Sequence, residues 1–138
     1  MSAFKVFDVA GSALSAQTVR LNATASNLAN AQVVSSSEQD AYRAKLPVFA
    51  SVLDSLGSES ASASVSVTGI RESQAPVPRE YAPGNPLADA EGYVYHSNVN
   101  VVEEMANMIS ASRSYQNSVE VMNTTKQLLL STLRLGQE

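Results

Sequence analysis

The chain has 138 residues, a formal net charge of −4 and no cysteine. This length supports one compact domain or two small pieces, and a chain without cysteine has neither disulfides nor a thiolate metal site. The mild negative charge, with no basic run, argues against nucleic acid as a partner. No apolar run approaches the roughly 18 residues of a membrane span, so we expect no direct membrane insertion.

The N-terminal segment lacks the pattern of a cleaved signal peptide. Asp8, Gln17, Arg20 and Asn22 interrupt the apolar stretch that such a peptide requires. If the protein leaves the cytoplasm, we therefore expect it to do so without a cleaved Sec-type signal.

A long helix is predicted from about residue 3 to about residue 30. Large apolar residues recur every seven positions, at Phe7, Leu14, Leu21 and Leu28. This spacing is typical of one row of a coiled-coil seam. The companion row is mostly small and includes Gly11, which costs about 1 kcal/mol relative to Ala inside a helix. Gly11 is either a local weakness or a position where another helix comes close.

The middle of the chain is predicted to form a small β element of two to four strands. Residues 45–53 suit a strand or the start of a short helix, whereas residues 65–70 alternate with period two, as a strand does. The Ser-rich stretch 56–64 predicts a turn. Residues 75–86 hold four of the five prolines and are therefore extended or turning. A turn at Gly92 precedes a further short strand.

A second long helix is predicted in the C-terminal third, with clear signals at both ends. Asn100 is a candidate N-cap, and Glu103 stands at the third helical position, as a capping box requires. Arg134 in the last turn and Gly136 beyond it supply a stop signal. The heptad rows of this helix carry large side chains at Val101, Met108, Tyr115, Val119, Met122, Leu129 and Leu133.

The sequence carries no recognisable catalytic, metal or cofactor site. The single histidine, His96, has no neighbours with ligand or triad spacing, and a surface or partly packed role explains it better. Glu103 and Glu104 are adjacent, so on a helix they do not converge as an acid–base pair would. We therefore expect no enzymatic activity and no cofactor.

The two helices have three possible roles. They form the core of an ordinary small domain, or bind a membrane surface, or mediate self-association. Membrane binding has weak support because Lys5 and Arg20 are the only cations of the first helix. Burying the large apolar residues of the first helix yields less free energy than the conformational entropy of ordering its backbone costs. We therefore expect ends that are disordered or loosely helical alone and become ordered on assembly.

Two segments, residues 13–32 and residues 98–136, resemble the bacterial flagellar basal-body rod family. The first contains "SNLANA" at 26–31, a motif shared by rod and hook proteins. The second contains "NVNVVEEM", "MISASRSYQ" and "VEV", which resemble the C-type proximal rod proteins of that family most closely. After the first motif the chain keeps Tyr42 and Arg43 but lacks the Gly-Pro of the family's usual turn.

The resemblance implies a mainly α fold with a small β element. Residues 1–32 and 98–138 would be helices paired as a coiled-coil core, and residues 33–97 would form a middle loop and a small β-rich outer domain. The protein would be a structural subunit of the proximal rod, without enzymatic activity. It would be exported by the flagellar type III apparatus without signal cleavage and stack helically within the periplasm. Its partners would be other copies, the B-type, F-type and distal rod subunits, ring adaptors and the export apparatus.

The predicted subunit interface draws on both helices. Its residues are Phe7, Leu14, Leu21, Asn27, Leu28, Asn30, Val101, Met108, Tyr115, Val119, Met122, Leu129 and Leu133. By this resemblance Asn27 and Asn30 hydrogen-bond across subunits or cap the end of the first helix. The alternative function is a soluble coiled-coil adaptor or export chaperone, which would keep stable helices in solution.

Overall fold

A computed structural model describes residues 3–54 and 62–136. The elements follow the order α1 (Ala3–Ala29), β1 (Val34–Ser35), β2 (Lys45–Asp54), β3 (Ser62–Glu72), β4 (Arg79–Tyr81), β5 (Tyr93–His96) and α2 (Val101–Leu135). Long helices at both ends and a small antiparallel β-rich middle confirm the predicted fold class. Residues 56–61 of the turn predicted at 56–64 lie outside the described residues, and residues 62–64 belong to β3 instead of a turn.

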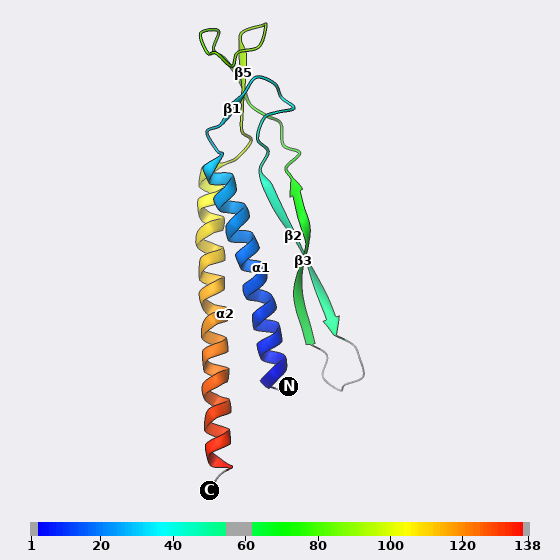
Figure 1. Ribbon diagram of the computed structural model, residues 1–138, viewed down its shortest axis with the longest axis vertical. Helices are drawn as coiled ribbons and strands as arrows, with labels where there is room; N and C mark the ends of the chain where they lie inside the picture. Colours follow the sequence, from blue (N-terminus) through cyan, green and yellow to red (C-terminus); the bar gives the residue numbers. More distant parts are fainter. Residues whose placement is uncertain (1–2, 55–61, 137–138) are drawn as a thin grey trace.

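The two helices run antiparallel side by side, and α1 lies between α2 and the hairpin of β2 and β3 (Figure 1). The short strands β1, β4 and β5 lie beyond the end of the helix pair where α1 stops and α2 begins. With 27 and 35 residues, α1 and α2 differ in length by about 12 Å at 1.5 Å per residue. The last turns of α2 therefore extend past the start of α1.

Local hydrogen bonds mark the start of α2 and the end of α1 near the positions that the sequence predicts. Asn100 caps α2, because its side-chain oxygen accepts from the backbone N–H groups of Val102 at 3.1 Å and Glu103 at 3.3 Å. Glu103 and Glu104 lie in the first turn, where the positive end of the helix dipole favours them. At the end of α1, Asn30 donates its backbone N–H and its side-chain Nδ2 to Ser26 O.

Five strands form two antiparallel sheets within the described residues. One has the order β1-β5-β4, and the other pairs β2 with β3. Residues 45–54 form a strand, which settles the alternative of a short helix. The prediction of two to four strands was therefore too low. The strands β1 and β4 have only two and three residues, which is too short for an alternating pattern to show in the sequence. The ladder of β2 and β3 shifts register between Val48 and Phe49, leaving Thr68 as an extra residue of β3.

The interior is built mainly from small side chains. The buried apolar residues are Ala10, Ala16, Ala23, Ala41, Ala44, Val94 and Ala111. Val94 and Asn27 are the largest side chains that are fully buried. Many large apolar residues stay exposed, including Ile109, Leu128, Leu133 and Leu135 on α2. Because the free energy of burial scales with the apolar area buried, a single chain gains little stability from burying its apolar side chains.

Candidate functional site

The four large apolar residues of α1 that are predicted at the interface are half-buried within one chain, whereas smaller residues, including the predicted Asn27, are fully buried. The half-buried set is Phe7, Leu14, Leu21 and Leu28. The buried set is Ala10, Ala16, Ala23, Thr24 and Asn27. A Cβ atom added at Gly11 would meet nothing within 4 Å, so the described residues of the chain do not make the close approach that was one explanation for this glycine.

On α2 the fully buried residues are Glu104 and Ala111, which are not among the predicted interface residues. They are seven positions apart, and the half-buried Ser118 and Thr125 continue the row. Because this row contains no large apolar residue, heptad spacing of large apolar residues does not indicate it. The predicted residues lie outside it: Val101, Tyr115 and Leu133 are exposed, and Met108, Val119, Met122 and Leu129 are half-buried.

An apolar groove of about 390 Å³ lies between the N-terminal half of α1 and the middle of α2. Val6, Val9 and Ala13 line it from α1, and Ser118 and Val121 line it from α2. Val121 is 47% exposed. The helix pair thus leaves both a groove and large apolar side chains uncovered in the single chain. Their contacts with neighbouring subunits stay a prediction.

Asn27 of the "SNLANA" motif ties the end of α1 to the start of β2. Its Oδ1 accepts from the backbone N–H of Lys45 at 2.8 Å and from Tyr42 Oη at 3.1 Å. Its Nδ2 donates to the carbonyl of Lys45 at 3.0 Å. The side-chain amide therefore pairs with Lys45 as a neighbouring strand would. Asn27 is 1% exposed, so these contacts within the chain use most of its hydrogen-bonding groups.

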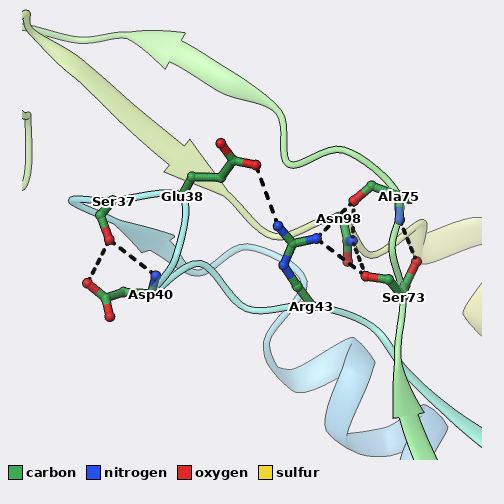
Figure 2. A network of polar contacts seen from close by, with 7 residues as sticks. All are labelled: Ser37, Glu38, Asp40, Arg43, Ser73, Ala75 and Asn98. Atoms are coloured by element: carbon green, nitrogen blue, oxygen red, sulfur yellow. Dashed lines mark hydrogen bonds and ion pairs between the residues drawn. The ribbon is translucent and has the colours of Figure 1, made fainter.

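A second asparagine, Asn98, joins the segment that precedes β2 to the segment that follows β3. Its Oδ1 accepts from Ala44 N at 2.7 Å, and its Nδ2 donates to Ala75 O at 2.9 Å. Figure 2 shows Asn98 and the guanidinium of Arg43 meeting at the carbonyls of Ser73 and Ala75. Arg43 also reaches Glu38 at 3.5 Å. We call Asn27 and Asn98, with the segments they bind, the junction.

Sequence reasoning identified Asn27 and Asn30 but missed Asn98. Asn30 follows the local-capping interpretation, since its Nδ2 donates to Ser26 O at 2.8 Å. The partners of Asn27 and Asn98 lie 18 and 54 residues away along the chain. No local pattern marks such distant partners, so the role of Asn98 in the junction could not be predicted from the sequence.

The small sheet contains a tight turn held by a carboxylate. Asp89 Oδ1 accepts from the backbone N–H groups of Glu91 and Tyr93, each at 2.9 Å, and Gly92 adopts φ +87°. The hydrogen bond from Tyr93 lowers the pKa of Asp89 most strongly. Partial burial, followed by the charge of Asp89, raises the pKa of Tyr95. The predicted turn at Gly92 is confirmed.

The described residues include no group of three or more His, Cys, Asp or Glu that could hold a metal ion. His96 Nε2 lies 2.7 Å from Glu80 Oε2, and both side chains are partly exposed. Across residues 3–54 and 62–136, no helix is both long and apolar enough to cross a membrane. The features that stand out are therefore the uncovered helix faces and the junction.

Comparison with known proteins identifies the family. The family "Flagella basal body rod protein" matches residues 7–34, and "Flagellar basal body rod FlgEFG protein C-terminal" matches residues 90–135. Flagellar basal-body rod protein FlgC of Salmonella typhimurium is 53% identical and that of Escherichia coli O6:H1 is 55% identical. FlgC of Bacillus subtilis is 37% identical. Each alignment covers 99% of this chain and 100% of the relative. The chain belongs to the flagellar basal-body rod protein FlgC family.

Proposed function

We propose that this chain is a structural subunit of the proximal flagellar rod, which assembles helically with other copies after type III export without signal cleavage. In this proposal residues 1–32 and 98–138 form the helical core, and residues 33–97 form the outer part. The rod would lie in the periplasm. The B-type, F-type and distal rod subunits would be its neighbours, and the export apparatus would deliver it.

The observation that carries the proposal is the distribution of side-chain size on the helix pair. Alanines are buried between the elements, while Ile109, Leu128 and Leu133 are 56%, 65% and 64% exposed. Large exposed apolar patches are typical of protein contacts, whereas isolated exposed apolar residues are not. The last turns of α2, which extend past α1, carry several of these residues. A subunit that is completed by its neighbours accounts for this arrangement.

The proposal is tested by electron microscopy of basal bodies from a strain that lacks this chain. We expect membrane rings without a completed rod, and restoration of the rod when the wild-type chain is supplied. Complete rods and normal swimming in the deletion strain would refute a required structural role. The alternative of an adaptor or export chaperone has no support among the three relatives compared above, each of which is named as a rod protein.

A further inference from the structure

Among the described residues, the hairpin of β2 and β3 has no third strand at either of its two outer edges. In an antiparallel pair, backbone groups of successive residues point alternately toward the partner strand and away from it. The outward groups of such an edge are a template for another strand. The positions that face outward decide where this hairpin could be extended.

Two contacts with α1 determine which residues of β2 face outward. Lys45 exchanges backbone hydrogen bonds with the Asn27 side chain, so its N–H and carbonyl point away from β3. By alternation, Pro47, Phe49, Ser51 and Leu53 also face outward. The far end gives the same result independently: Val65 lies opposite Ser51, and its N–H donates to Ser12 Oγ on α1 at 3.1 Å.

The outward edge of β2 is protected at its start and open further along. Asn27 covers Lys45, and Pro47 has no N–H to offer. The strands cross in Figure 1, so that α1 meets the edge of β2 near Lys45 and the edge of β3 near Val65. Within the described residues, the outward backbone groups of Phe49, Ser51 and Leu53 have no hydrogen-bond partner. Residues 46–53 carry no charge, so the usual protection by charged side chains is also missing.

The edge of β3 supplies a matching surface on the other side of the same hairpin. Val67 lies opposite Phe49, and Ile70 lies opposite Pro47, so their backbone groups also face outward. The side chains of Phe49, Val67 and Ile70 share one face of the ribbon, because directly opposed residues do so. Phe49 is 40% exposed and Ile70 is 53% exposed.

We propose that the open edge of β2 at Phe49, Ser51 and Leu53 pairs with the edge of β3 at Val67 and Ile70 in a neighbouring copy of this chain. This inference rests on the proposed function and adds a second contact between copies, separate from the helices. Each copy would use β2 on one side and β3 on the other. Such a head-to-tail contact repeats from copy to copy, as an extended assembly requires.

Replacement of Ser51 by proline tests the pairing selectively. Pro47 already occupies an outward position of β2, so Ser51→Pro should leave the hairpin intact while removing the donor that a neighbouring strand needs. Ser51→Ala is the matched control. In the deletion strain, we expect Ser51→Ala to restore rods and swimming. We expect Ser51→Pro to reduce the swimming halo at least tenfold and leave rods incomplete, with secretion within twofold of the control.

Complete rods with Ser51→Pro would overturn the inference while leaving the proposed function intact, whereas failure of the wild-type chain to restore rods would overturn the proposed function. If the melting temperature of purified Ser51→Pro is below that of Ser51→Ala, loss of rods could reflect lost stability, and a third variant, Ser51→Lys, separates the two causes. Ser51→Lys keeps the backbone N–H and adds only a charge at the edge. Loss of rods with a folded Ser51→Lys supports the pairing, and complete rods refute it.

Discussion

Replacing Asn27 by alanine should open the junction. The change removes the hydrogen bonds that Asn27 makes with Lys45 N, Lys45 O and Tyr42 Oη, at 2.8, 3.0 and 3.1 Å. Each is worth about 0.5–1.5 kcal/mol net, so local opening should become easier by about 2–4 kcal/mol. Because a tenfold change corresponds to about 1.4 kcal/mol, protection of the Lys45 amide against hydrogen exchange should fall about 30- to 1,000-fold.

Nuclear magnetic resonance of the purified chain measures this exchange residue by residue. Asn22→Ala is the control, since Asn22 lies on the exposed face of the same helix, and its Lys45 amide should exchange as in the wild type. Asn30→Ala removes one side-chain hydrogen bond, to Ser26 O, and should alter the end of α1 with little effect at Lys45. If Asn27→Ala changed Lys45 exchange no more than Asn22→Ala does, the role assigned to the Asn27 amide would be wrong.

Gly92→Ala should destabilise the small sheet by about 1–3 kcal/mol, since φ is +87° and the new methyl would lie 2.9 Å from Tyr81 Cε2; faster exchange of the Ala82 amide, which bonds Gly92 O, reports it. Because backbone hydrogen bonds to the Asp89 carboxylate lower its pKa, the ionised side chain stabilises the turn above about pH 4. That stabilisation is lost as the pH falls through the lowered pKa, so exchange of the Tyr93 amide, corrected for its intrinsic rate, should rise there in the wild type and not in Asp89→Asn. Leu28→Asp and Met122→Asp should each abolish motility while secretion of the subunit persists, and normal swimming by both would contradict their assignment to the subunit interface.

The helices could be predicted from the sequence because their signals are local. Asn100 lies directly before the helix that it caps, and Phe7, Leu14 and Leu21 lie within a few turns of one another in α1. The strand at residues 45–54 was ambiguous because eight uncharged residues suit either structure until a partner is known. Its partner, β3, supplies the hydrogen bonds that make it a strand.

The packing between the helices could not be predicted in the same way. Periodicity identifies a face of a helix but not the element that covers it. On α2 the row with Glu104 and Ala111 is buried, while Val101 and Tyr115, which have the size expected of core residues, are each 38% exposed. The larger row suits a contact that a single chain does not contain, and it stays a prediction for the assembled state.

The two contacts of the junction also predict an order of folding. Asn27 closes a loop of 18 residues with Lys45, whereas Asn98 closes one of 54 residues with Ala44. The entropy of closing the longer loop is greater by about 1 kcal/mol. We therefore expect the contact between Asn27 and the start of β2 to form before the contact between Asn98 and Ala44. The contacts of Asn98 with Ala44 and Ala75 join segments on both sides of the hairpin, so we expect α2 to come into register after the hairpin has formed.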